Sequence, residues 1–162
     1  KQLIKECNKR KIIIDLSHLN EKGFWDIEKL SQSPLIATHS NAHSICTHTR
    51  NLTDKQLSAI KDSGGMVGVN FAPAFLRTDG KMLADTDLDI ILRHFNYLIE
   101  KLGDDKVGFG SDFDGALIPS GINDVLGLNK LRLLMKNHGF NDQLMKKLCH
   151  DNWVNVISKI LG

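Results

Sequence analysis

The sequence has little of what membrane proteins and secreted disulfide-bonded proteins require. It contains three cysteines, Cys7, Cys46 and Cys149, whose wide spacing argues against a disulfide framework and against a cysteine-based zinc site. The apolar run near its amino terminus is three isoleucines, far short of a signal-peptide core or of the ~20 residues that span a membrane. We therefore expect a cytoplasmic protein with no membrane segment in this chain.

An excess of charge of one sign is also lacking. The 21 Lys and Arg residues nearly balance the 19 Asp and Glu residues, and the basic residues are scattered, with residues 9–11 as the densest run. Nucleic acid is therefore not an expected partner. A chain of 162 residues, 41% hydrophobic and 25% charged, fits one globular domain over residues 1–162 with a sizeable core.

Four short apolar runs have the length and composition of buried strands, and they alternate with segments of helical periodicity. The predicted strands are residues 12–16, 35–38, 66–70 and 107–110. The predicted helices are 22–32, a helix that begins at a Thr53–Gln56 capping box and stops at Gly64-Gly65, 86–102, 123–137 and 141–161. This alternation predicts the α/β class, a parallel sheet covered by helices, in which chemistry gathers at the carboxyl ends of the strands.

Each predicted strand delivers a polar, ligand-capable residue to that edge: His18, His39, Asn70 and Asp112. Imidazole nitrogens together with carboxylates suit Zn²⁺ or a similar divalent ion. For a lone histidine, a core side chain hydrogen-bonded to backbone is the commoner interpretation. Two histidines at equivalent strand ends favour joint metal ligation. For Asp112, a ligand-binding role and an ordinary loop role stay equally open.

The other polar residues of these loops favour less specific interpretations. Asp114 with Gly115 is typical of a turn. His43 and His48 are expected on a loop or helix surface, although His39 and His43 also have the spacing of one helix face. Arg50 could be a solvated charge or could bind a substrate carboxylate, and spacing alone favours the surface.

Four stretches together are similar to one known family. IIIDLSH, SPLIATHSNAHSICTHTRNLTD, GGMVGVNF and LGDDKVGFGSDFDG resemble, in order and spacing, the membrane dipeptidase (renal dipeptidase) family of metallopeptidases, peptidase family M19. The resemblance runs essentially from Lys1 to Gly162. It implies a (β/α)8 barrel of the TIM type, with two zinc ions at the carboxyl ends of the strands and hydrolysis of dipeptides through a metal-activated water.

The resemblance also implies roles for single residues. His18 and His39 match the family's metal-ligating histidines. Arg50 matches the arginine that contacts the substrate carboxylate, and Asp112 matches the aspartate that contacts the substrate and helps proton transfer. His43 departs from family members that carry tyrosine or another residue there, which leaves the substrate preference open.

Other family residues have no counterpart here. The family's H-x-D ligand pair, the glutamate that bridges both zinc ions and a further substrate-binding histidine lie upstream of the first motif, and residues 1–17 match none of them. The chain thus resembles the carboxyl-terminal half of the barrel, which predicts a homo-oligomer or pairing with a missing amino-terminal half. The alternative function is a non-catalytic remnant or an assembly subunit of a split dipeptidase. A related amidohydrolase-type barrel acting on cyclic amides is a weaker option.

Overall fold

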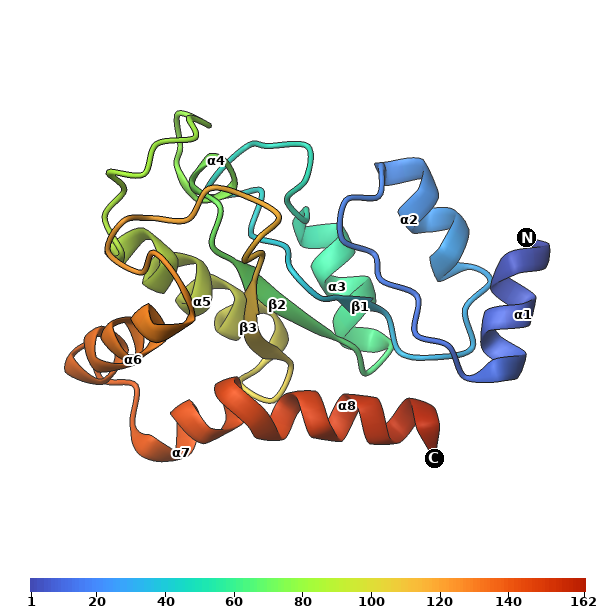
Figure 1. The fold of residues 1–162 in the computed structure, drawn as a ribbon. Helices are drawn as coiled ribbons and strands as arrows, with labels where there is room; N and C mark the ends of the chain where they lie inside the picture. Colours follow the sequence, from blue (N-terminus) through green and yellow to red (C-terminus); the bar gives the residue numbers. More distant parts are fainter.

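A computed structural model, which describes residues 1–162, contains one sheet of three parallel strands (Figure 1). The strands are β1 (Ile36–Ala37), β2 (Met66–Asn70) and β3 (Val107–Ser111), in the order β1-β2-β3. In the register, Ile36 lies opposite Met66 and Val67 opposite Val107. The predicted α/β class and three of the four predicted strands are confirmed.

The predicted strand at 12–16 is wrong as a regular element. The segment forms only an isolated parallel bridge between Asp15 and Ile36, on the open side of β1. The segment pairs with β1 only at this bridge, no strand pairs with its other side, and Ile12 remains 52% exposed. Its apolar composition is strand-like, but a strand also needs a partner for its backbone groups.

Helices make up most of the remaining chain. They are α1 (Gln2–Arg10), α2 (Glu21–Glu28), α3 (Asp54–Asp62), α4 (Pro73–Leu76), α5 (Asp89–Leu102), α6 (Leu128–Asn137), α7 (Asp142–Lys146) and α8 (Asn152–Leu161), with a 3₁₀ turn η1 (Val125–Gly127) and a π-helical turn η2 (Lys147–Asp151). The helices α1 and α4 were not predicted. None of the helices has the length and apolar character that crossing a bilayer requires.

The start and stop signals of α3 act as predicted. Thr53 accepts a hydrogen bond from the Gln56 backbone N–H, and the Gln56 side chain accepts one from the Thr53 backbone N–H. Gly64, with φ +72°, follows the end of the helix in the left-handed conformation that glycine tolerates. Both helix ends are thus determined by local sequence.

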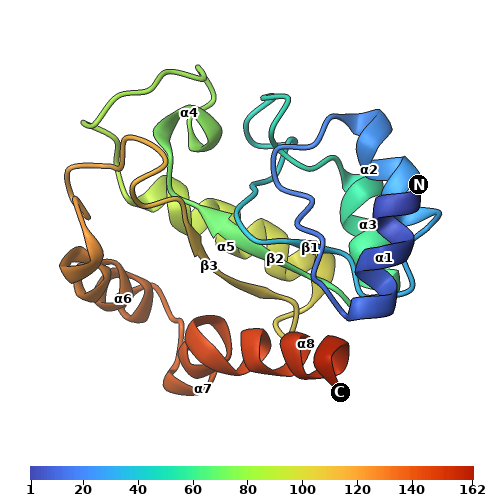
Figure 2. The ribbon, with the colours of Figure 1, turned by 45° about the vertical axis from the view of Figure 1, so that its right-hand side comes forward.

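Helices cover both faces of the sheet. In Figure 1, α3 and α5 lie behind the strands and α8 crosses beneath them, and Figure 2 shows the same layers from the side. The main core joins Val67, Val69 and Val107 to α3 and α5, and a smaller cluster packs Ile36 and Met66 against α8. The strands carry glycine where Trp153 of α8 lies closest, because a Cβ at Gly108 would overlap its indole ring.

His94, which is completely buried on α5, connects the helix to two loops. Its Nδ1 accepts the Ala42 backbone N–H at 3.2 Å, and its Nε2 donates to the Leu76 carbonyl at 3.0 Å. Burial lowers the pKa of His94 to about 4, and the positive charge of Arg93 acts in the same direction. The imidazole is therefore neutral and holds the loop after β1 beside the end of α4.

This buried imidazole makes stability depend on pH. The unfolded imidazole has a pKa of about 6.5, so between that value and about 4 the unfolded chain binds a proton that the folded chain does not. The free energy of unfolding should therefore fall by up to about 3 kcal/mol as the pH drops through this interval. Denaturant unfolding of the chain and of His94→Gln across this interval measures the effect. A slope equal in both proteins would contradict it.

Candidate metal centre

Two histidine side chains from different loops meet at the carboxyl edge of the sheet. His39 directly follows Thr38 at the end of β1, and His18 follows the bridge at Asp15. Their Nε2 atoms lie 2.7 Å apart, and their ring centroids are 4.5 Å apart. Two unprotonated nitrogens at this distance would repel each other, so either one donates a proton to the other or a cation binds both.

A carboxylate from the third strand completes the cluster. Ligand atoms of His18, His39 and Asp112 all lie within 4.8 Å of one another. Asp112 Oδ2 accepts a hydrogen bond of 2.9 Å from Asn70 Nδ2, which comes from the end of β2. Gly115 leaves room for this carboxylate, because a Cβ there would overlap Asp112 Oδ1. The end of each strand thus contributes to one small cluster.

The backbone around the cluster is strained at the two outer ligands. His18 has φ +68° and Asp112 has φ +78°, both in the left-handed region that residues other than glycine seldom occupy. A bulge in β3 precedes Asp112, since Asn70 pairs with Ser111 although Val69 pairs with Phe109. Bulges and such conformations cost free energy, about 1–3 kcal/mol for each such residue, and occur often next to functional sites.

His39 is held by several groups around it. Its ring Nδ1 lies 2.6 Å from Thr38 Oγ1, which is itself 2.5 Å from Asp15 Oδ2. Its backbone N–H donates to Ser17 Oγ at 2.9 Å. Burial alone would raise the pKa of Asp15, but hydrogen bonds from Thr38 and Ser17 outweigh it, and the pKa lies below its usual value. Asp15, Ser17 and Thr38 are functional candidates that the sequence reasoning missed.

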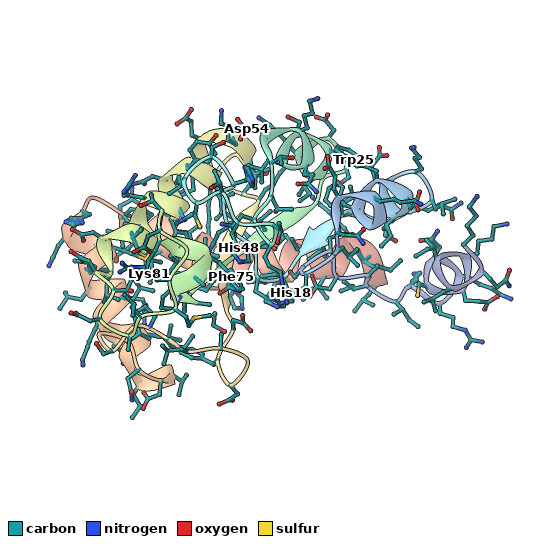
Figure 3. The ribbon with its side chains drawn as sticks, turned by 90° about the horizontal axis from the view of Figure 1, so that it is seen from above. His18, Trp25, His48, Asp54, Phe75 and Lys81 are labelled. Carbon is teal, nitrogen blue, oxygen red and sulfur yellow. The ribbon has the colours of Figure 1, made fainter.

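Arg50 is exposed and forms no ion pair, and it shares one aromatic neighbour, Phe75, with His18. The guanidinium carbon of Arg50 is 5.9 Å from the centre of the Phe75 ring. The rings of His18 and His48 lie 6.3 Å and 4.7 Å from the same ring. Figure 3 looks down on this face and shows His18, His48 and Phe75 close together. Phe75 is therefore a shared neighbour of an unpaired guanidinium and of the candidate ligand His18.

Arg50 also lines a cavity of about 280 Å³ between the loop before α2 and the loop before α3. Leu16, Leu19 and Phe24 form part of its apolar wall, and His43 lies at its polar side. Since His43 is only partly buried, its imidazole can contact a molecule that enters this cavity. His43 thus lies in a loop, as the sequence predicts.

Buried amides fix the loops that carry these groups. Asn41 accepts the Asn70 N–H and donates to the carbonyls of Asn70 and Phe75. Asn51 donates to the Phe75 and Cys46 carbonyls at 2.8 Å and 2.9 Å. Amides pair with loop carbonyls in this way because buried backbone groups need partners. The carbonyl of Phe75 is thus held from two sides.

The outcome for the predicted site residues is uneven. His18, His39 and Asp112 come together in one cluster, and Asn70 supports it. The remaining candidates, Arg50, His43, His48 and Asp114, lie outside that cluster. Asp114 is exposed with φ +64°, as its predicted turn role requires.

Known proteins resemble this chain over nearly its whole length. The model of the membrane dipeptidase family, peptidase family M19, matches residues 1–161. The chain belongs to this family. An uncharacterized protein in the pqqA 5′ region of Klebsiella pneumoniae is 51% identical over 158 residues, which are 98% of this chain and 58% of that protein.

Two solved structures of family members have the same fold. A metallopeptidase from Rhodobacter sphaeroides, bound to a phosphinate mimic of the dipeptide L-Ala-D-Ala, is 55% identical with a TM-score of 0.96. The dipeptidase AC of family M19 is 56% identical, also with a TM-score of 0.96. The match covers 98% of this chain in both cases, but 45% and 47% of those chains. The chain thus spans about half the length of these relatives.

Membership of a metallopeptidase family implies a metal, and the donors of this chain fit one. Two imidazole nitrogens and one carboxylate oxygen form a ligand set that zinc accepts, with bonds of about 2.0–2.2 Å. The three donors come from separate loops, and their ligand atoms lie within 4.8 Å of one another. A pair of zinc ions would need more protein donors than these three.

We expect the isolated chain to bind one zinc ion weakly through His18 and His39. Mutation of a residue that only hydrogen-bonds to a metal ligand typically reduces metal affinity by about 10- to 100-fold. His39→Ala removes a ligand itself, so it should reduce the zinc affinity by more than that. Competition with a chromophoric chelator measures the affinity. His48→Ala is the matched control, because it removes a nearby imidazole without touching the cluster, and it should bind zinc normally. Loss of binding in His48→Ala together with normal binding in His39→Ala would mean that the ligands are assigned wrongly.

Proposed function

We propose that this chain supplies half of the active site of a zinc-dependent dipeptidase. The convergence of His18, His39 and Asp112 at the carboxyl edge of a parallel sheet, in a chain of the M19 family, is the observation that carries the proposal. Zinc supplies Lewis acidity toward the scissile carbonyl and lowers the pKa of water to about 7. In this proposal His18 and His39 bind the metal.

Asp112 has the position of a proton carrier beside the metal ligands. Asn70 donates to one of its oxygens, which holds the carboxylate plane and leaves the other oxygen to accept a proton from the attacking water. The same group can then give that proton to the leaving amine, since a single side chain within reach can act as base and then as acid. Asp112 therefore serves as the catalytic residue and contacts the substrate.

Arg50 is the proposed partner of the substrate's free carboxylate. Its guanidinium is exposed and unpaired, and a planar fork of donors binds a carboxylate with two parallel hydrogen bonds. Because Arg50 and His18 lie 5.9 Å and 6.3 Å from the centre of the Phe75 ring, a substrate held by Arg50 and by the metal ligands has to be short. This arrangement favours dipeptides, and the cavity beside Arg50 and His43 would receive the residue next to the carboxylate.

In this proposal the chain folds as the carboxyl-terminal half of a (β/α)8 barrel. The outer edge of β3 has no partner, and the outer side of β1 has only the single bridge at Asp15. Unpaired edges invite further strands, and apolar side chains such as Leu117 and Leu126 remain 45% and 77% exposed. Pairing with an amino-terminal half, or with a second copy of this chain, would cover these edges.

A non-catalytic subunit or remnant is the alternative function. The observation that favours it is the small donor set: His18 and His39, with Asp112 beside them, offer fewer protein ligands than the proposed two-metal reaction needs. In that case the chain would keep the fold and the weak metal site without hydrolysing peptides.

Complementation separates the two functions. Alone, the chain should self-associate in light scattering and hydrolyse L-Ala-D-Ala at background rate, because half of the ligands are absent. Mixed with the remaining half of the Rhodobacter sphaeroides enzyme, it should gain chelator-sensitive activity. The two halves of that enzyme, mixed in the same way, are the control.

The outcomes of that experiment differ clearly. If the control pair is active and the mixed pair is not, the non-catalytic function is favoured. A monomer of the isolated chain that binds two zinc ions and cleaves dipeptides would overturn the half-site proposal.

In the complemented enzyme, Arg50→Gln should raise KM by about 10- to 100-fold, which corresponds to a charged hydrogen bond of about 1.5–3 kcal/mol. The value of kcat should change much less, because Arg50 binds the carboxylate equally in the ground state and in the transition state. Arg132→Gln, on the exposed face of α6, is the matched control. A carboxyl-terminally amidated dipeptide should bind weakly to the unsubstituted enzyme and equally weakly to Arg50→Gln. A twofold or smaller effect on KM would exclude the role of Arg50.

A further inference from the structure

A chain of hydrogen bonds, which we call the relay, joins Asp15 through Thr38 to His39. Asp15 Oδ2 lies 2.5 Å from Thr38 Oγ1, and Thr38 Oγ1 lies 2.6 Å from His39 Nδ1. Asp15 comes from the bridge segment, whereas Thr38 and His39 come from the end of β1. Neither Asp15 nor Thr38 lies in the ligand cluster itself.

The direction of each hydrogen bond in this chain follows from the number of protons. An aspartate is ionised at neutral pH and can only accept. Asp15 Oδ1 already accepts the backbone N–H groups of Ser17 and Thr38, both at 2.9 Å, and Oδ2 accepts from the Thr38 hydroxyl. The hydroxyl has one proton, and it is used there. At Thr38 Oγ1 only lone pairs remain, so His39 Nδ1 has to donate.

We propose that Asp15 and Thr38 are positioning residues that fix His39 as the Nδ1–H tautomer and so leave its Nε2 lone pair free for the metal. The opposite tautomer would place two acceptors, Thr38 Oγ1 and His39 Nδ1, face to face at 2.6 Å unless the hydroxyl turned away from Asp15. Turning it would leave Asp15 Oδ2 without its donor. The relay therefore leaves Nε2 of His39 unprotonated before any ion binds.

His18 is not prepared in the same way. Its Nδ1 has no hydrogen-bond partner, and its ring is exposed. Since His39 Nε2 is an acceptor in the relay, the 2.7 Å contact requires His18 Nε2 to donate its proton while no metal is bound. Binding a metal between them would thus require a change of tautomer at His18 only. The two ligands therefore differ: His39 already has the tautomer that binds a metal, whereas His18 has to change its tautomer.

Nitrogen-15 NMR of the histidine-labelled, metal-free chain tests the relay, at a pH well above about 6.5 where imidazoles are neutral. His39 should give a protonated Nδ1 and an unprotonated Nε2. Thr38→Val, which replaces the hydroxyl by a methyl group of similar size, should give a mixture of tautomers. Thr38→Ser should restore the single form, and Thr47→Val, at an exposed threonine of the same loop, should change nothing.

Asp15→Asn provides a sharper test because it reverses the relay. The two backbone N–H groups at Oδ1 require the amide oxygen in that place, so the amide NH₂ lies at the Oδ2 place and donates to Thr38. The Thr38 hydroxyl then donates to His39 Nδ1, and the expected tautomer of His39 becomes Nε2–H. An Nε2–H form in the unsubstituted chain, or an Nδ1–H form that persists in both Thr38→Val and Asp15→Asn, would overturn the proposal.

Zinc affinity is the second measurement, and it rests on the proposed role of His39 as a ligand. Thr38→Val and Asp15→Asn should each lose about 10- to 100-fold, and Thr38→Ser should lose little. If the tautomers change as expected but the zinc affinity does not, the relay does not serve the metal. If the tautomers are as expected and no variant binds zinc, including the unsubstituted chain, the relay stands and the proposed metal function fails.

Discussion

The hydrogen-bonded register of three parallel strands determines where His39, Asn70 and Asp112 lie, and one bridge to β1 brings the segment of His18 to the same edge. Because β1, β2 and β3 run in the same direction, their carboxyl ends meet at one edge, and Thr38, Asn70 and Asp112 arrive there from positions far apart in the sequence. The register is in turn fixed by the packing of the strands between α3 and α5 on one face and α8 on the other. Without that packing, the ends of the strands and the side chains of the cluster would have no fixed positions.

The edge itself is held by polar side chains rather than by apolar contacts. Buried asparagines pair with the loop carbonyls, and His94 joins the loop after β1 to the end of α4. A buried polar group without a partner costs about 1–3 kcal/mol, and in this network only Asn51 Oδ1 lacks one. Asn70 also donates to the Asp112 carboxylate, which helps to hold Asp112 at its positive φ. Polar contacts therefore order the strand ends together with the apolar packing.

Much of this arrangement could be predicted from local sequence. The α3 capping box, the stripe of α5 and the composition of β2 and β3 each act within a few residues, so the pattern alone predicts them. The prediction of a strand at 12–16 failed because apolar, β-branched composition does not show whether a neighbouring strand pairs with the segment. His18 and His39 were found because they follow apolar runs. Asp15 and Thr38 were missed because their role depends on a contact between two distant segments.

X-ray absorption at the zinc edge, on the chain loaded with one equivalent of zinc, probes the central cluster most directly. We expect two imidazole ligands with nitrogen and oxygen donors at about 2.0–2.2 Å, and His39→Ala should remove one imidazole from that shell. A sulfur shell at about 2.3 Å would mean that a cysteine binds the metal. A spectrum with that sulfur shell, or one unchanged by His39→Ala, would show that the convergence of His18, His39 and Asp112 does not form the metal site.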